Sequence, residues 1–311
     1  MTTQHRILII GRNGQMAQEL AALHWAEASP HFLGRNDIDL YRLGELGQRI
    51  QTLGPDIIVN TVGYTAIDRA EQEPEAAFLL NATAPDNLAN VAAELNIPFI
   101  HLSSDHVFDG RKDRAYCEGD TTAPISVLGE SKIAGELAVA RAGGRHLILR
   151  SSWLFGLYGD NFLKNMLFMG RLRRSMGAVD DQFGCPTPAA ELAVMLRRVA
   201  LEMLDGRIYP NILHYCGDTP TTWFRFAQEI FHLAAPRQSP PRLSAITTAE
   251  MHARAARPRN SVLDCGLAQV MGFAQPDWLA ALPALIATLL ATAPSSERLT
   301  ADSASAGADA A

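Results

Sequence analysis

A glycine-rich turn near the start of the chain has the spacing of a phosphate-binding site. The segment GRNGQMA, residues 11–17, follows the apolar run RILII and leads into a helical pattern. Gly11 permits a tight turn, Gly14 lets backbone N–H groups approach a pyrophosphate, and Ala17 leaves room for the helix to pack on the strand. The predicted chemistry is dinucleotide binding, and a plain strand–helix turn is the structural alternative.

The end of the next strand indicates which dinucleotide is preferred. In FLGRNDIDL, residues 32–40, Gly34 stands where an acidic residue would hold a ribose 2′-hydroxyl, and Arg35 follows it. A guanidinium in place of a carboxylate favours a 2′-phosphate. Arg12 in the glycine turn adds a second positive charge. We therefore expect NADPH as the cofactor, with NADH as the alternative.

A second group of residues could handle the charge that develops when a hydride reduces a ketone. Lys132 lies on a predicted helix within ISVLGESKIAGE, residues 125–136, and Ser104 ends the segment PFIHLSS. In a Tyr-x-x-x-Lys pair the tyrosine lies one helical turn before the lysine and donates the proton. That position is Leu128 here, and leucine can donate neither a proton nor a hydrogen bond.

Another group would have to replace the missing acid. His106 is the first candidate, because the ordinary histidine pKa near 6.5 suits a proton donor. Tyr116, Ser126 and water are the other candidates, although a serine hydroxyl is a weak acid. The alternatives are that His106 only fills space and that Lys132 binds a cofactor without supporting catalysis.

Alternating strand and helix patterns position these residues. Apolar runs of the kind buried in parallel sheets occur at 6–11, 56–60, 98–104 and 146–152. They predict an α/β fold with a Rossmann-type, doubly wound parallel sheet and a smaller C-terminal substrate-binding lobe. We expect a Rossmann domain at 1–152 that is interleaved with later segments, a substrate lobe with returning elements at 153–292, and a disordered tail at 293–311.

Composition excludes several classes of function. The chain has 311 residues, of which 48% are hydrophobic and 19% charged, and a net charge of −6. It lacks a clustered Lys/Arg face, so we expect no nucleic-acid partner. No apolar run is long enough to cross a bilayer, so we expect a cytoplasmic protein without membrane contact. Four cysteines without CxxC spacing predict reduced thiols and no metal site.

The chain resembles the extended short-chain dehydrogenases and, within them, the dTDP-4-dehydrorhamnose reductase family. The resemblance covers residues 5 to about 290 and rests on the order of ILIIGRNGQMAQEL, HLSSDHVFDG, GESKIAGE, RSSWLFG, NFLKNM, DDQFGCPT and RPRNSVLD. Two positions depart from the family pattern, because Leu128 and His106 stand where the family has tyrosine. A third departure is TVGYT in place of the more common AAAYT.

The resemblance implies NADPH-dependent reduction of the 4-keto group of a dTDP-linked 6-deoxysugar. Catalysis would use Ser104 and Lys132, with His106 as a surrogate acid. The implied cofactor-binding residues are Gly11, Arg12, Asn13, Gly14, Gln15, Met16, Arg35, Asp39, Leu40, Val62, Gly63, Tyr64 and Lys132. The implied substrate-binding residues are Ser104, His106, Trp153, Asn161, Phe162 and Arg257.

Two other functions remain open at this point. A non-catalytic NADP(H)-binding regulatory or scaffold subunit would explain the loss of the tyrosine and the retention of the glycine turn. Epimerisation of a related sugar nucleotide is weaker, because it would need the same tyrosine. The sequence leaves open whether the protein acts alone, as a homodimer or with a partner enzyme.

Overall fold

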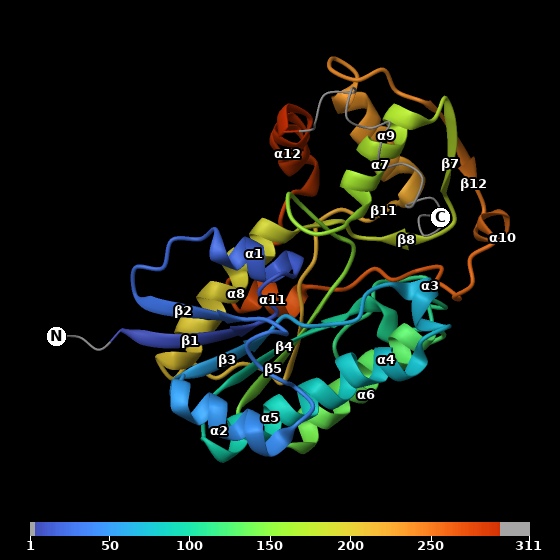
Figure 1. The fold of residues 1–311 in the computed structure, drawn as a ribbon. Coiled ribbons are helices and arrows are strands. Elements are labelled where there is room, and N and C mark those ends of the chain that lie inside the picture. The colour runs from blue at the N-terminus through green and yellow to red at the C-terminus, as the bar shows by residue number, and fades with distance from the viewer. Residues whose placement is uncertain (1–3, 293–311) are drawn as a thin grey trace.

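A parallel sheet forms the larger lobe of the molecule (Figure 1). The computed structural model describes residues 4–292, and the predicted tail at 293–311 lies outside the described residues. The strands of the sheet lie in the order β10-β5-β4-β3-β1-β2, and every neighbouring pair is parallel. Their bounds are His5–Ile10 for β1, Ala28–Leu33 for β2, Ile57–Asn60 for β3, Phe99–Ser104 for β4, His146–Ser151 for β5 and Ile212–His214 for β10.

The inner strands are those with continuous apolar runs in the sequence. Both faces of β1, β3, β4 and β5 are covered, so nearly every side chain in these strands is buried. The edge strands lack such runs. β2 reads ASPHFL and is half-exposed, and β10 has only three residues. The predicted fold class, an α/β protein with a Rossmann-type parallel sheet, is confirmed.

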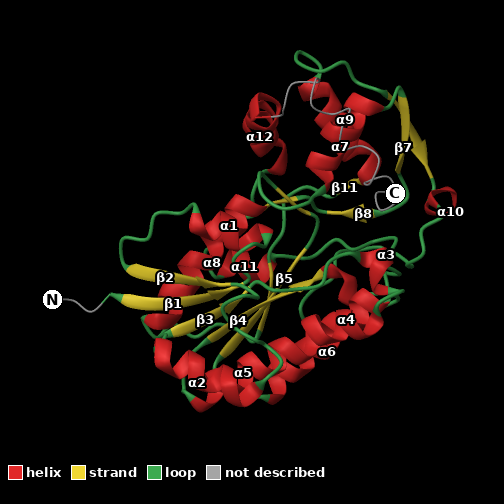
Figure 2. Ribbon diagram, viewed as in Figure 1, coloured by secondary structure: helices red, strands yellow, loops and turns green. Residues whose placement is uncertain are grey.

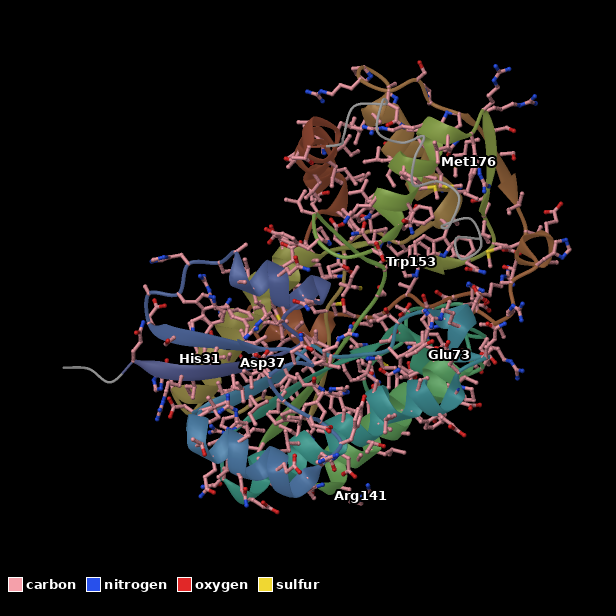
Figure 3. The ribbon with its side chains drawn as sticks, in the orientation of Figure 1. His31, Asp37, Glu73, Arg141, Trp153 and Met176 are labelled. Atoms are coloured by element: carbon pink, nitrogen blue, oxygen red, sulfur yellow. The ribbon has the colours of Figure 1, made fainter. Side chains whose placement is uncertain are left out.

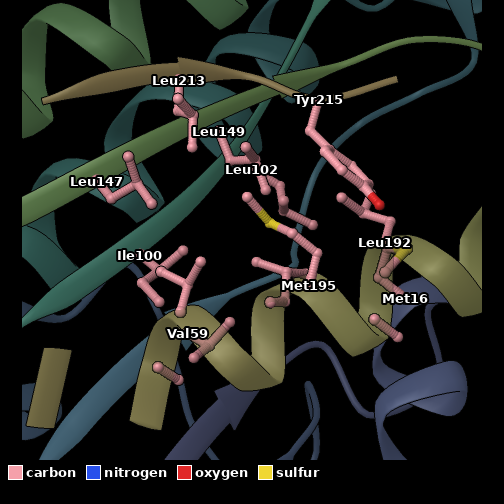
Figure 4. Close-up of a cluster of buried hydrophobic side chains, with 14 of the residues drawn as sticks. Met16, Val59, Ile100, Leu102, Leu147, Leu149, Leu192, Met195, Leu213 and Tyr215 are labelled. Atoms are coloured by element: carbon pink, nitrogen blue, oxygen red, sulfur yellow. The ribbon is translucent and has the colours of Figure 1, made fainter. Parts of the chain in front are cut away.

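Helices cover both faces of the sheet (Figure 2). One face carries α1 (Gln15–Ala21), α8 (Ala189–Leu204) and α11 (Gly266–Val270), and the other carries α2 (Leu43–Leu53), α5 (Ala84–Glu94) and α6 (Val127–Arg141). Figure 4 shows the first of these cores, where Leu192 and Met195 of α8 pack on Ile100 and Leu149 of the sheet. Short elements α3 (Ile67–Ala70), α4 (Pro74–Phe78) and a π-helical turn (Leu79–Thr83) precede α5.

The smaller lobe is built from the second half of the chain. Its helices are α7 (Phe162–Leu172), α9 (Trp223–Ala234), α10 (Thr248–Met251) and α12 (Trp278–Thr292). Its strands pair as β7 (Ser175–Val179) with β12 (Arg242–Ile246), and β8 (Phe183–Gly184) with β11 (Thr221–Thr222). The short strands β6 (Leu154–Phe155) and β9 (Thr187–Pro188) join the lobes. Because α8, β10 and α11 return to the sheet, the lobes are interleaved along the sequence.

The strand order places a crevice at the carboxyl ends of β1 and β3. β1 pairs with β2 on one side and with β3 on the other. The chain therefore builds the sheet outward from β1 in one direction with β2 and in the opposite direction with β3 and the later strands. Ligands of doubly wound sheets bind at such a switch point. Within residues 4–292, no helix is both long and apolar enough to cross a membrane.

Candidate active site

A cleft of about 720 Å³ lies at this switch point. Its walls include the predicted cofactor residues Gly11, Asn13, Gly14, Arg35, Asp39, Leu40, Val62 and Gly63. The glycines are needed there for physical reasons. Gly11 has φ of +114°, and a Cβ at this residue would lie 2.7 Å from Thr61 Oγ1. Glycine therefore lets the turn after β1 pack against Thr61 at the edge of the cleft.

Other predicted cofactor residues have side chains engaged within the protein. The Arg12 guanidinium donates to the Phe32 carbonyl and pairs with Asp37, and the Tyr64 hydroxyl donates to Glu73 at 2.7 Å. Gln15 has a buried Nε2 without a hydrogen-bond partner. The Met16 side chain does not face the cleft, so only its backbone could contact a cofactor, and its place in the cofactor site remains a prediction. The side chain is 4% exposed and packs in the core beneath the sheet, because it lies on the inner face of α1 (Figure 4).

Lys132 reaches the same crevice from α6. Its Nζ donates to the Leu102 carbonyl at 3.3 Å, and a Cβ on Gly63 would lie 2.7 Å from that Nζ. Burial lowers the pKa of Lys132 to about 8, although Glu136 one turn later opposes the shift. Glu136 is itself held by Arg150 and Ser103. Lys132 is therefore a buried ammonium whose Nζ lies next to Gly63, and Gly63 lines the cleft.

Asn81 is a residue of this site that the sequence reasoning missed. Its Oδ1 accepts from the Tyr64 N–H at 2.8 Å, and its Nδ2 donates to the Tyr64 carbonyl and to Ser131 Oγ. The buried amide thus ties the loop after β3 to helix α6, next to Lys132. The only signal in the sequence is an asparagine in an otherwise apolar helical stretch.

Ser104 and His106 lie at the carboxyl end of β4. Ser104 Oγ donates to Asp105 Oδ1 at 2.9 Å and accepts from the His106 N–H at 3.2 Å, which starts a 3₁₀ turn at Asp105–Val107. Helix α6 packs directly on this turn, because a Cβ on Gly129 would lie 2.2 Å from the His106 carbonyl oxygen. The structure therefore brings Ser104, His106 and the start of α6 together.

Leu128 leaves no donor at the start of α6. Its side chain is 5% exposed and packs with Ala70 and Ala77, with Tyr64 and Ile67 against the same cluster. It lines neither this cleft nor the second cleft described next. The position that would carry the acid is thus part of an apolar contact between α6 and the α3–α4 segment.

A second cleft, of about 520 Å³, lies between the lobes. Of the predicted substrate residues, it is lined by His106, Trp153, Phe162 and Arg257. The Trp153 ring stacks on Trp223 with centroids 3.5 Å apart and planes 8° apart. Trp153 lies where the lobes meet, and Met176 lies on the wall formed by the smaller lobe (Figure 3). An aromatic wall with a few polar groups suits a ligand that has both a ring and charged or hydroxyl groups.

Comparison with known proteins identifies the family. Residues 5–291 match the family described as the RmlD substrate binding domain. The chain is 40% identical to a dTDP-4-dehydrorhamnose reductase of Sinorhizobium fredii over 92% of this chain and 98% of the relative. The protein belongs to the RmlD family.

Other relatives and a solved structure agree with this assignment. The Escherichia coli K12 dTDP-4-dehydrorhamnose reductase is 34% identical over 92% of this chain and 98% of its own length. A crystal structure of the Bacillus anthracis dTDP-4-dehydrorhamnose reductase in complex with NADP superposes with a TM-score of 0.85 at 31% identity. It covers 92% of this chain and 100% of the solved one.

In this RmlD-family chain, two of the candidate surrogate acids have other roles. The Tyr116 hydroxyl donates to Asp109 at 2.7 Å and accepts from the Lys112 N–H, and its ring stacks on Phe108 in the core. Burial raises the pKa of Tyr116, which weakens it further as an acid. Ser126 caps α6 by accepting from the Gly129 N–H. Neither residue lines the second cleft, so the proposals for these two donors are corrected.

Asn161 has the role of a helix cap in this structure. Its Oδ1 accepts from the Lys164 N–H, which begins α7, and its Nδ2 donates to the carbonyls of Gly156 and Tyr158. Its side-chain polar groups thus shape the loop that leads to Phe162. Its contact with substrate remains a prediction.

His106 remains the candidate acid that faces the second cleft. Burial lowers its pKa below the ordinary histidine value, Asp105 opposes the shift, and Arg257 adds to it. Its Nδ1 is buried and has no hydrogen-bond partner. At neutral pH the imidazole is therefore mostly neutral, and it must gain a proton before it can act as an acid.

Asp68 connects Arg257 of the second cleft to the Rossmann lobe. Its carboxylate accepts from both Nη atoms of Arg257, at 3.2 and 2.5 Å, and from the backbone N–H groups of Arg254 and Ala255. Burial would raise the pKa of Asp68, but these hydrogen bonds outweigh it and lower the pKa. The carboxylate thus holds the 254–257 segment against α3.

Asp68→Asn is expected to destabilise the protein by about 1–3 kcal/mol at pH 7, because Arg257 loses its charged partner. A carboxyl with a lowered folded pKa stabilises the protein above its unfolded pKa of 3.8, and this contribution is lost as the pH falls further. Urea unfolding at pH 7 and near pH 3.5 would measure the difference. Asp86→Asn, which alters the exposed pair with Arg141, is the matched control. An equal penalty at both pH values would contradict the prediction.

Proposed function

We propose that the protein reduces the 4-keto group of dTDP-4-dehydro-6-deoxy-L-mannose, with NADPH, to dTDP-L-rhamnose or a close sugar nucleotide. The observation that carries this proposal is the match to reductases of that name over nearly their whole length. Retention of Ser104 at the end of β4 and of buried Lys132 on α6 supports it. In the balanced reaction, hydride and a proton add across the carbonyl, and NADPH becomes NADP⁺.

The first cleft has the features that a dinucleotide requires. Gly11, Gly14 and Gly63 in the wall present backbone without side chains to a ligand, and Arg35 in the wall suits a 2′-phosphate. Lys132 would hold the nicotinamide ribose. When bound, the reduced nicotinamide supplies the hydride. The presence of NADP in the Bacillus anthracis relative supports the same cofactor here.

The second cleft would hold the sugar nucleotide. The stacked pair of Trp153 and Trp223 offers an apolar face to a ring. Arg257 lines the cleft and would donate to a diphosphate, although Asp68 offsets part of its charge. The ketone oxygen gains negative charge as hydride arrives, and it needs a hydrogen bond and a proton. Ser104 would donate the hydrogen bond once its hydroxyl turns away from Asp105. His106 in its imidazolium form, or water, would supply the proton.

A second candidate function is a non-catalytic NADP(H)-binding regulatory or scaffold subunit. The burial of Leu128 in an apolar cluster favours it, because this chain has no hydroxyl at the usual donor position. A subunit of this kind would need the first cleft but no acid. It would bind the dinucleotide and a protein partner without turning over a sugar.

An assay of the purified protein tests the first proposal. NADPH oxidation is followed with dTDP-4-dehydro-6-deoxy-L-mannose, and the Escherichia coli relative serves as the positive control. We expect turnover about 10²–10⁴-fold below that of the control, because the tyrosine donor is missing. Turnover at the no-enzyme level would contradict the reductase proposal. In that case NADPH binding to the folded protein would favour the non-catalytic subunit.

A further inference from the structure

The outer end of the first cleft combines positive and negative charge around one glycine. Gly34 lines the cleft and directly follows β2. A Cβ at Gly34 would lie 3.5 Å from Arg12 Cβ and 3.6 Å from Asp37 Oδ2. Asp37 Oδ2 accepts from the Gly34 N–H at 2.8 Å and pairs with Arg12 Nη1 at 3.1 Å. The carboxylate and the guanidinium therefore lie behind Gly34, which lines the cleft, and do not line it themselves.

Arg12 is held there by more than this ion pair. Its Nε and Nη2 both donate to the Phe32 carbonyl, the first at 2.9 Å. Its side chain is 50% exposed, and that of Asp37 is 27% exposed. Loss of the Asp37 charge would therefore leave the guanidinium in place, with Nη1 free to bind an added anion. Asp37 lies in the lobe that contains the sheet (Figure 3).

Carboxylates offset much of the positive charge at this edge. Arg35 lines the cleft and contributes one positive charge, and Arg12 contributes another that Asp37 offsets. Asp39, also in the wall, pairs with Arg42 at 3.5 Å on its outer side. A 2′-phosphate carries a charge near −2 at neutral pH, whereas a 2′-hydroxyl is neutral and can donate to a carboxylate. The Asp37 carboxylate therefore disfavours binding of a 2′-phosphate and tolerates a 2′-hydroxyl.

We propose that Asp37 determines how strongly the protein prefers a 2′-phosphorylated dinucleotide over an unphosphorylated one. By pairing with Arg12, it limits the positive charge available to a 2′-phosphate and keeps NADH binding competitive. The proposal rests on the proposed function, because it needs the dinucleotide in the first cleft. Selectivity at this edge would then depend on Asp37 as well as on Gly34 and Arg35.

The test compares binding of two pairs of ligands to wild type and Asp37→Asn. The pairs are NADPH with NADH, and 2′,5′-ADP with 5′-AMP, each titrated by calorimetry at fixed ionic strength. Asparagine keeps an oxygen that can accept from the Gly34 N–H and removes the charge. Asp56→Asn is the matched control, because Asp56 also accepts one backbone N–H, from Arg6, near the opposite end of the sheet.

We expect Asp37→Asn to raise the NADPH-to-NADH affinity ratio about three- to ten-fold, with a similar change for the fragment pair, since an opposing charge at partly solvated range is removed. The ratio for Asp56→Asn should stay at the wild-type value. An unchanged or lower ratio for Asp37→Asn, with wild type binding both dinucleotides, would overturn the selectivity role alone. If wild type binds neither dinucleotide, the proposed function fails as well.

Discussion

Leu128→Tyr is expected to raise turnover of the sugar nucleotide by about 10²–10⁴-fold, the usual contribution of a positioned general acid. Position 128 precedes Lys132 by one turn of α6, so a tyrosine there shares a helix face with the ammonium. The ammonium would stabilise the phenolate and so lower the tyrosine pKa toward the working range. Ser104 already lies close to the start of this helix.

Steady-state rates of NADPH oxidation at saturating sugar nucleotide measure this effect. Leu137→Tyr is the matched control, because Leu137 is on the same helix but 63% exposed, and it should not change the rate. A rate for Leu128→Tyr equal to that of wild type would show that the missing hydroxyl does not limit the reaction. Because Leu128 is buried among Ala70, Ala77 and Tyr64, urea unfolding would check that the Leu128→Tyr protein remains folded.

His106→Asn in both backgrounds identifies the donor that wild type uses. If His106 is the acid, its loss should slow wild type by about 10²-fold and leave the Leu128→Tyr protein almost unaffected. The lowered pKa of His106 also fixes the sign of the pH dependence. Wild-type turnover should rise as the pH falls below 6.5, because the imidazolium becomes populated there. Equal slowing in both backgrounds would indicate a role in binding instead.

Lys132→Met is expected to reduce dinucleotide affinity and turnover by at least about 10²-fold while making the fold more stable. The ammonium is buried, and its pKa is about 8 in the folded protein against 10.5 in the ordinary state. Holding the charged form in the interior therefore costs about 3 kcal/mol at neutral pH. The lost hydrogen bond to the Leu102 carbonyl offsets about 1 kcal/mol of the gain.

The pH dependence of this stabilisation has a definite sign. Because the folded pKa of Lys132 lies below the unfolded one, wild type gains stability as the pH rises from about 8 toward 10.5. The advantage of Lys132→Met in urea unfolding should therefore be largest at pH 7 and shrink over that range. Lys164→Met is the control, because Lys164 Nζ also donates to a backbone carbonyl, that of Gly159. A less stable Lys132→Met protein at pH 7 would refute the account.

The sequence by itself determined the inner part of the sheet and placed several of its predicted cofactor residues around one cleft. Continuous apolar runs predicted β1, β3, β4 and β5, because strands buried on both faces need them. The glycine spacing at positions 11 and 14 predicted dinucleotide binding at the turn after β1, and both glycines line the cleft there. The absence of the acid was also evident from the sequence, because helical spacing alone relates Leu128 to Lys132.

Only the tertiary structure decided what each polar side chain contacts. It assigned Tyr116 to Asp109, Arg257 to Asp68 and Asp37 to Arg12. It also placed the edge strand β2, whose half-exposed surface requires no apolar run. The physical reason is that periodicity reports which side of an element is buried, whereas a hydrogen bond or ion pair depends on groups that the fold brings together. Asp68 and Arg257, for example, are 189 residues apart in the chain.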